Sequence, residues 1–397
     1  MDKARVCYIL RSHYPKVFGI RRALQTLKVK RLYKHVLSKE EIEVCEKDPS
    51  KKKIVVEPYL SKWKKYLSAA NIEMEDILQN GPLYKNREDK DSLRTDMIFC
   101  RLAYGFIPSE YVSFELEDKT PEERKEYVSD IDMNFFGYTV NDIKVIQGIL
   151  DKGDSFNRFK EYFKRDAIII QKKSDYRVFH AFVQKHPIFV KKVVFSSMGK
   201  GIELVDISEK GNERDYFESL IAQGKFLLEE RVIQHPEMAR FNDSSVNTVR
   251  CFTMKIGKDI IVPWCFMRTG RNGSFVDNGG SGGLVIGIEH ATGIINSAGY
   301  DEYNDPFFKH PDTGIEFIGS KIPDWETLIS MCKSAHEEVD GMGYLSWDLA
   351  YTDSGWVVIE VNEVGQFIGP QMTMKKGIKK ELWSYLERMQ KYTFFGD

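Results

Sequence analysis

The chain has 397 residues and a formal net charge of −1, with 42% hydrophobic and 29% charged residues. This composition supports a buried core across two or three domains and excludes an extensively disordered chain. The balanced charge gives no general basis for nucleic-acid binding, and the scattered cysteines, without a C-x-x-C pair, favour reduced thiols over a disulfide framework or a zinc site.

The apolar segments predict neither membrane crossing nor secretion. No apolar run approaches the ~18 residues that are needed to span a bilayer. The N-terminal stretch contains early basic residues but lacks the sustained apolar run of a signal peptide. We therefore expect a cytoplasmic protein, with peripheral attachment to the inner face of the membrane as an alternative.

Residues 1–145 are predicted to be mostly helical. Apolar and basic positions recur at helical spacing over residues 17–37, and residues 61–78 have an apolar face. Between Lys3 and Lys39 there are eleven Lys or Arg and no Asp or Glu. This basic stretch could rest on an anionic membrane, meet a glycan-assembly partner, or form a solvated terminal helix, and the sequence leaves these interpretations open.

From about residue 150 onward, short apolar and β-branched runs alternate with Gly-rich turns, which is typical of strands. The predicted strands are residues 167–170, 188–190, 225–228, 249–256, 260–266, 284–288, 345–351 and 356–361. Helices are predicted at residues 155–163, 216–222, 325–339 and 379–392. This mixture indicates an α+β protein with mainly antiparallel sheets.

The sharpest chemical pattern lies near the C-terminal end. Glu360 and Asn362 are two residues apart on an apolar strand, so their side chains point to the same face. A turn at residues 352–355 would place Asp348, on the preceding strand, beside Glu360. Two carboxylates and an amide oxygen form a hard ligand set that suits Mg²⁺ with bound phosphates, with Mn²⁺ as an alternative ion. A solvated hairpin with two acidic residues is the competing interpretation.

Two other segments have features of nucleotide binding. Lys191 lies at a strand end, where its ammonium can reach phosphate oxygens. A Gly-containing loop follows at residues 196–201 and can cover phosphates with its N–H groups, although it is not a Walker A sequence. An apolar strand that runs into Glu229 and Glu230 could form a hinge beside adenine. Each segment taken alone is also typical of ordinary hairpins and strand ends.

In their order along the chain, these elements resemble the ATP-grasp superfamily over roughly residues 145–395. The resemblance implies an ATP-grasp fold, in which two α+β subdomains (residues 146–225 and 226–397) grip ATP between antiparallel sheets, after a helical region of residues 1–145. Lys152 resembles the first phosphate lysine and Lys191 the second, although Lys192 stands where the family has proline. Asp348, Glu360 and Asn362 match the metal ligands. The implied nucleotide-binding residues are Lys152, Lys191, Ser197, Gly199, Gly201, Glu229, Glu230, Val232 and Asn247.

A narrower resemblance is to the sugar-transfer-associated, glutamate-ligase-like ATP-grasp branch, through residues 235–237, 244–250, 276–283 and 369–371. Arg250 interrupts an apolar strand and therefore needs a partner. The implied catalytic residues are Arg250, Lys191 and Arg268, although Arg268 also fits a solvated turn. The implied acceptor-binding residues are Asp277, Asn278, Gly280, Gly282, Gly283 and Gln371.

The resemblance implies an ATP- and Mg²⁺-dependent ligase that joins a carboxylate to an amine through an acylphosphate. Because members of the branch are associated with bacterial surface polysaccharides, the implied substrates are small molecules, one of them a carboxylated sugar or glycan precursor. Two alternatives stay open: a kinase of this fold that phosphorylates a hydroxyl, and a non-catalytic nucleotide-binding scaffold. No nucleic-acid partner is expected.

Overall fold

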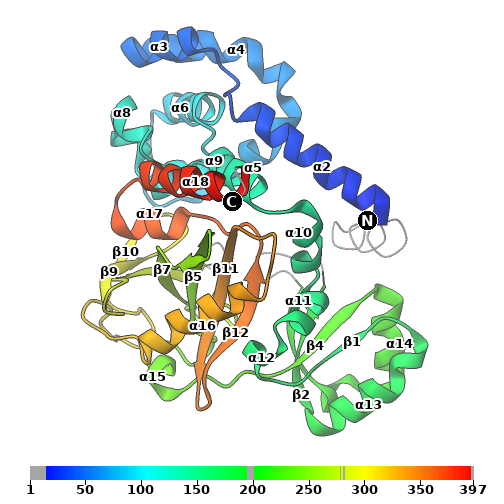
Figure 1. Ribbon diagram of the computed structural model, residues 1–397. Helices are drawn as coiled ribbons and strands as arrows, with labels where there is room; N and C mark the ends of the chain where they lie inside the picture. The colour runs from blue at the N-terminus through cyan, green and yellow to red at the C-terminus, as the bar shows by residue number, and fades with distance from the viewer. Residues whose placement is uncertain (1–14, 195–200, 278, 280–281, 395–397) are drawn as a thin grey trace.

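A computed structural model describes residues 15–194, 201–277, 279 and 282–394. Over these ranges the chain forms two antiparallel sheets and a helical N-terminal region (Figure 1). Four predicted site residues lie outside the described residues, namely Ser197, Gly199, Asn278 and Gly280.

The N-terminal region is helical, as predicted. Side-chain caps fix several of its helix starts: Ser38 and Thr120 each form a capping box with the glutamate three residues later. Within the described ranges, no helix combines the length and the apolar character that crossing a bilayer requires. The helices are α2 (Pro15–Leu32), α3 (Lys39–Lys47), α4 (Lys52–Lys62), α5 (Lys64–Asn80), α6 (Lys90–Ala103), α7 (Pro108–Ser113), α8 (Pro121–Arg124), α9 (Asp130–Val140) and α10 (Ile143–Leu150).

The smaller sheet has the strand order β1-β4-β2-β3, and its pairs are antiparallel. Two short helices lead into it, and two longer ones pack on one of its faces through an apolar cluster that includes Phe179, Phe189 and Phe217 (Figure 1). The elements are α11 (Lys152–Arg158), α12 (Lys160–Phe163), β1 (Ala167–Ile170), α13 (Tyr176–Lys185), β2 (Ile188–Val193), β3 (Ile202–Asp206), α14 (Glu213–Gln223) and β4 (Phe226–Glu230).

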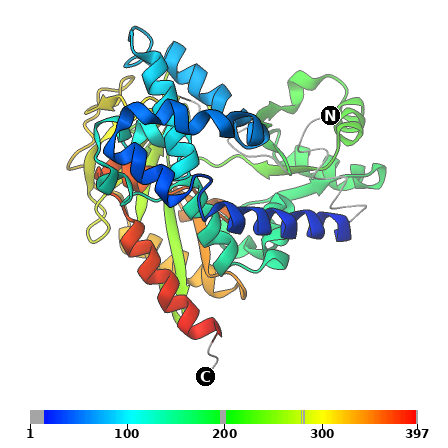
Figure 2. The same cartoon turned by 90° about the horizontal axis from the view of Figure 1, so that it is seen from above.

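The larger sheet has the order β10-β9-β8-β7-β5-β11-β12, and β6 pairs with β5 beside this path. Figure 2 shows the helices of the N-terminal region beside both sheets. The elements are α15 (Pro236–Ala239), β5 (Thr248–Ile256), β6 (Asp259–Ile261), β7 (Cys265–Thr269), β8 (Leu284–Ile288), β9 (Ile295–Tyr300), β10 (Pro306–Phe307), α16 (Trp325–Glu337), β11 (Tyr344–Thr352), β12 (Gly355–Asn362), α17 (Ile368–Met374) and α18 (Lys379–Phe394).

Two differences from the predicted elements have clear physical causes. Residues 260–266, predicted as one strand, are divided into β6 and β7 around Pro263, because proline cannot donate a hydrogen bond to a sheet. The domain boundary predicted after residue 225 would separate β4 from its hydrogen-bonded partners β1 and β2. The smaller sheet therefore continues to Glu230.

The alternation of side chains along a strand explains why the predicted site residues Arg250 and Asp348 share one face of the larger sheet. One face packs on α16 through Cys251, Trp347 and Leu349. On the opposite face, α18 covers Phe252 and Tyr344 at one end of the sheet. Because side chains two apart point the same way, Arg250 and Asp348 lie on this second face, beyond the end that α18 covers. The fold thus leaves a polar patch at the open end of an otherwise apolar layer.

A buried histidine under this sheet predicts a pH-dependent stability. Nε2 of His336 donates to the carbonyl of Met342 at 2.8 Å, while Nδ1 lies 2.7 Å from the Thr253 hydroxyl. Burial lowers the pKa of His336 from 6.5 to about 4. Between these values the unfolded chain binds more protons than the folded one, so stability is lost as the pH falls.

We expect the free energy of unfolding to decrease by up to about 3 kcal/mol between pH 6.5 and pH 4 through this group. Urea titrations of the wild type and of His336→Gln across this range would measure the contribution. The wild type should lose more stability than the variant as the pH falls. Parallel pH profiles would contradict the assignment.

Candidate functional site

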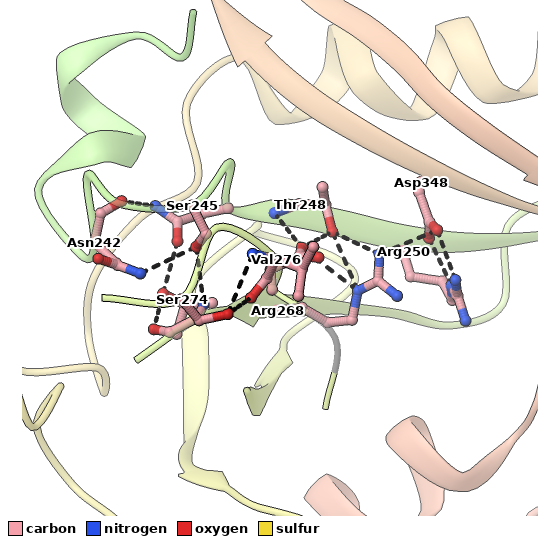
Figure 3. A network of polar contacts seen from close by, with 12 residues as sticks. Asn242, Ser245, Thr248, Arg250, Arg268, Ser274, Val276 and Asp348 are labelled. Carbon is pink, nitrogen blue, oxygen red and sulfur yellow. Dashed lines mark hydrogen bonds and ion pairs between the residues drawn. The ribbon is translucent and has the colours of Figure 1, made fainter. Parts of the chain in front are cut away.

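Asp348 is the centre of the polar patch and is held by two arginines (Figure 3). Its oxygens accept hydrogen bonds from Arg250 Nε and Nη2, both at 2.6 Å. Nη2 of Arg268 lies 3.0 Å from Oδ2. The register places Arg250 on β5 and Glu360 on β12 directly opposite Asp348 on β11, so three adjacent strands present charged groups at one level. The predicted pairing of Asp348 with Glu360 is therefore confirmed.

Electrostatics keep Asp348 ionised. Burial alone would raise its pKa, but the charges of Arg250 and Arg268 outweigh this effect and bring the pKa to about 2. Burial alone would lower the pKa of Arg250, but the negative charge of Asp348 outweighs this effect, so the pKa of Arg250 is raised. The carboxylate and the guanidinium groups thus depend on one another to stay charged in a buried position.

Glu360 and Asn362 extend the patch along β12. Oε1 of Glu360 lies 2.9 Å from Nζ of Lys152, which stands at the start of α11. Asn362 lies opposite Ser346 in the register, and its amide nitrogen is buried without a hydrogen-bond partner among the described residues. The structure therefore brings Lys152 to the predicted metal-binding carboxylate.

A second buried cluster joins the smaller sheet to the larger one. Oε2 of Glu229, on β4, accepts hydrogen bonds from Arg165 at 2.6 and 2.9 Å and from Nζ of Lys192 at 3.0 Å. Arg165 also donates to the carbonyl of Val358 on β12, at 2.6 Å. Burial raises the pKa of Glu229, but the two cations reverse this effect and lower it. These contacts hold the two sheets together beside Glu360.

Lys192, not Lys191, points toward the patch. Burial lowers the pKa of Lys192, while Glu229 and Glu360 partly offset this effect. Lys191 lies on the other face of β2, where its ammonium is 2.5 Å from Glu203 and 5.5 Å from the centre of the Phe226 ring. Because neighbouring residues of a strand point to opposite faces, only one of the two lysines can face the larger sheet.

The predicted hinge follows β4. Oε2 of Glu230 accepts a hydrogen bond from the N–H of Asp166 at 3.0 Å, so this side chain fixes the start of β1. Val232 is half-buried just after the strand. The side chain of Glu229 forms ion pairs with Arg165 and Lys192. Its backbone groups are therefore better placed than its carboxylate to contact the edge of an adenine base.

The acceptor residues predicted around the Gly-rich segment lie on the far side of Arg268. Asp277 accepts a short hydrogen bond from the Thr248 hydroxyl and lies 3.6 Å from Arg268 Nε. The hydroxyl of Thr248 also accepts from Arg268 at 2.9 and 3.1 Å. Gly282 has a φ of 88°, a conformation that favours glycine, and its carbonyl accepts from Arg271. Gly283 is buried next to it, at the start of β8.

Asn247 and Gln371, which were predicted to bind ligands, form hydrogen bonds within the protein. The amide nitrogen of Asn247 donates to Gln234, Met238 and Asn242, and its oxygen accepts from Thr269. Gln371 is fully buried, and it bonds the N–H and the carbonyl of Val128 in the N-terminal region. Because their polar atoms are used within the protein, these side chains brace loops. Gly201, with a φ of 77°, packs closely on Val193 at the end of the predicted loop.

The structural position of Asn247 gives a testable expectation. Asn247→Ala should lower the free energy of unfolding by about 2–4 kcal/mol, because it leaves buried carbonyls unpaired. The folded protein should keep the ATP binding that the sequence resemblance implies, measured by calorimetry. The matched control is Asp243→Ala, a nearby exposed position, which should change neither quantity. A large loss of ATP affinity with unchanged stability in Asn247→Ala would contradict this placement.

The residues of the patch fit a hydrated Mg²⁺ bound with a nucleotide. Asp348 and Glu360 supply carboxylate oxygens, and a carboxylate has about four acceptor sites, of which Asp348 uses three. The amide nitrogen of Asn362 is buried and has no hydrogen-bond partner among the described residues. Because the nitrogen and oxygen of an amide can be exchanged by a flip of the group, the oxygen can occupy this position and face the ion. Lys152 and Lys192 supply positive charge next to these groups. Oxygen ligands with adjacent cations are the combination that a metal–polyphosphate complex requires.

Comparisons with solved structures gave only distant similarities. A search of curated proteins gave no match. N5-carboxyaminoimidazole synthetase from Staphylococcus aureus, complexed with ADP, is 13% identical, with a TM-score of 0.38 over 58% of this chain and 48% of that one. VanG D-Ala:D-Ser ligase from Enterococcus faecalis is also 13% identical, with a TM-score of 0.41 over 64% of this chain and 63% of that one. The chain thus spans about half the length of the first of these proteins and under two thirds of the second.

The family comparison covers most of the polar patch. A family model described as sugar-transfer associated ATP-grasp matches residues 159–387, which is more than half of the chain. The match includes both sheets, and it starts after Lys152. The residues of the patch that it covers are Lys192, Arg250, Arg268, Asp348, Glu360 and Asn362. The predicted α+β fold is therefore confirmed, and the chain belongs to the sugar-transfer-associated ATP-grasp family.

Proposed function

We propose that this protein is an ATP- and Mg²⁺-dependent ligase that joins a carboxylate to an amine. The observation that carries the proposal is the convergence of Asp348, Glu360 and Lys152 between the two sheets, with Arg250 opposite Asp348. Carboxylates that can hold Mg²⁺, next to cations that can hold phosphates, are the parts that phosphoryl transfer needs.

The ion pairs of the patch suggest how it receives the nucleotide. Arg250 and Lys152 are paired with Asp348 and Glu360. A polyphosphate offers these cations alternative anionic partners, and this exchange frees carboxylate oxygens. When bound, Mg²⁺ would neutralise the phosphate charge between the ligands Asp348, Glu360 and Asn362. Lys192 would approach the phosphates from the smaller sheet, where burial has already removed part of its hydration.

The proposed reaction has two balanced steps. In the first, a substrate carboxylate oxygen forms a bond to the γ-phosphorus of ATP while the bond to the bridging oxygen breaks, which gives an acylphosphate and ADP. In the second, an amine nitrogen attacks the acyl carbon, phosphate leaves and a proton is lost. Arg250 and Arg268 would stabilise the negative charge on the transferred group and on the tetrahedral intermediate. The scheme requires no covalent intermediate with the enzyme.

Two observations support the proposed substrate class, namely the family description and the charges near the acceptor segment. The family is associated with sugar transfer, which favours a carboxylated sugar or glycan precursor as one substrate. Arg268 lies 3.6 Å from Asp277, Arg271 donates to the carbonyl of Gly282, and guanidinium groups bind carboxylates well. ATP as cosubstrate and the buried free thiols both fit a cytoplasmic reaction.

The test is a screen of purified full-length protein for ADP release with pairs of carboxylates and amines. The carboxylates would include uronic acids, and the amines would include amino acids and amino sugars. We expect ADP, free phosphate and an amide in equal amounts, identified by mass spectrometry. A phosphorylated sugar without free phosphate would overturn ligation in favour of a kinase. ATP binding without turnover over the whole panel would favour a scaffold.

A further inference from the structure

Helix α2 has an apolar stripe that is exposed and that points away from the described part of the protein. Its members are Val17, Ile20, Leu24 and Leu27, with exposed fractions of 50%, 60%, 60% and 63%. They are spaced three or four residues apart, which places them on one side of an α-helix. Four adjacent large apolar side chains that are at least half-exposed need an explanation, because soluble surfaces usually carry such residues singly.

The opposite side of α2 is fixed to the body of the protein. Val29 is buried, and α2 packs against α9 and α10. Arg22 donates to the Tyr138 hydroxyl and to Glu363, both at 3.1 Å. Glu363 directly follows Asn362 of the patch. The helix is therefore held in one orientation, with the apolar stripe exposed, and Figure 1 shows it at the edge of the molecule.

Basic side chains flank the stripe. Exposed lysines and arginines occur along α2, and the helix contains no Asp or Glu; the exposed basic residues are Lys16, Arg21, Lys28, Lys30 and Arg31. Long basic side chains can keep their charges at an anionic surface while their stems and the apolar stripe enter the interface. Exposed apolar residues beside basic ones can lie in the plane of an anionic membrane surface.

From this arrangement we infer that α2 binds the surface of an anionic membrane through the stripe of Val17, Ile20, Leu24 and Leu27. A second copy of the chain is a poorer occupant, although the stripe has the spacing of a coiled-coil seam. In such a pair the flanks of both helices would be basic, with no acidic residue in α2 to compensate. Charge complementarity thus favours anionic lipid. The inference is independent of the ligase reaction.

Flotation of the full-length protein with lipid vesicles tests this surface. Vesicles of phosphatidylcholine mixed with phosphatidylglycerol should bind the protein, vesicles of phosphatidylcholine alone should bind it much less, and added salt should weaken binding. Leu24→Asp combined with Leu27→Asp should reduce binding at least about tenfold. The matched control, Ile54→Asp with Ile72→Asp, changes two apolar residues that are 73% and 76% exposed on α4 and α5 and should bind like the wild type.

A second variant, which removes positive charge, tests the inference even if Leu24→Asp with Leu27→Asp does not fold. Arg21→Gln with Lys28→Gln leaves the stripe intact and should lower binding to the mixed vesicles while circular dichroism stays unchanged. Equal binding by the wild type and the stripe variant, or no preference for anionic lipid, would overturn the inference. A wild-type dimer that the stripe variant converts to a monomer, without vesicle binding, would assign the stripe to a second copy.

Discussion

Lys192→Met should lower nucleotide turnover at least about a hundredfold, whereas Lys191→Met should leave it within about threefold of the wild type. Methionine keeps most of the side-chain length and removes the charge. Lys192 is buried between the sheets, 3.0 Å from Glu229 and close to the backbone of Ile359 on β12. Lys191 pairs with Glu203 on the opposite face. The two neighbouring residues thus provide matched variants with opposite orientations.

ADP release with an active substrate pair, together with the dissociation constant for ATP from calorimetry, would measure both variants. Thermal unfolding should accompany these assays, because Lys192 also compensates the buried charge of Glu229. The remaining contact of Glu229 with Arg165 should keep Lys192→Met folded. If Lys191→Met lost turnover and Lys192→Met retained it, the proposed face for phosphate binding would be wrong.

Asp348→Asn should both abolish turnover and destabilise the protein, by about 3–5 kcal/mol. Asp348 is the shared partner of Arg250 and Arg268, and it is buried. Asparagine has nearly the same shape but no charge, so the variant leaves two guanidinium groups beside a neutral amide. Urea unfolding gives the stability, and ADP release gives the activity of the folded protein.

Glu360→Gln is the comparison that separates chemistry from stability. Glu360 is more exposed than Asp348, and its ion pair is with Lys152 alone among the contacts found in the described residues. The side chains of Lys152 and Glu360 are 13% and 32% exposed, and Glu360 has one ion pair where Asp348 has two, so this variant should lose less stability than Asp348→Asn. It should nevertheless lose turnover at least about a hundredfold through the metal site. Wild-type ADP release by a folded Glu360→Gln protein would remove Glu360 from the proposed site.

The parts of the site that depend on local sequence could be predicted, because the strand period and a short hairpin turn determine them. Glu360 and Asn362 share a face since they are two residues apart, and the turn from Thr352 to Gly355 brings Asp348 opposite Glu360. The partner of Arg250 was also expected, since an arginine in an apolar strand must be compensated. Asp348 provides that compensation.

The parts that depend on tertiary packing could not be predicted from the sequence. Alternation along β2 indicates that Lys191 and Lys192 point to opposite faces, but not which face meets the second sheet. Arg165 follows a left-handed residue, Lys164, and has no local pattern that indicates its partners. It contacts Glu229 on β4 and Val358 on β12, the latter 193 positions away in the chain. Asn247 and Gln371 lie in segments that resemble binding motifs, yet their hydrogen bonds are internal.

The central claim, acylphosphate chemistry at the Asp348–Glu360 patch, is tested most directly by oxygen transfer. A carboxylate that is active in the screen would be labelled with ¹⁸O in both carboxylate oxygens and incubated with the protein, ATP, Mg²⁺ and the amine. Because one labelled oxygen forms the bond to phosphorus, each released phosphate should contain one ¹⁸O atom, measured by mass spectrometry. Amide formation with unlabelled phosphate, or labelled carboxylate recovered intact alongside a phosphorylated product, would contradict the proposed reaction.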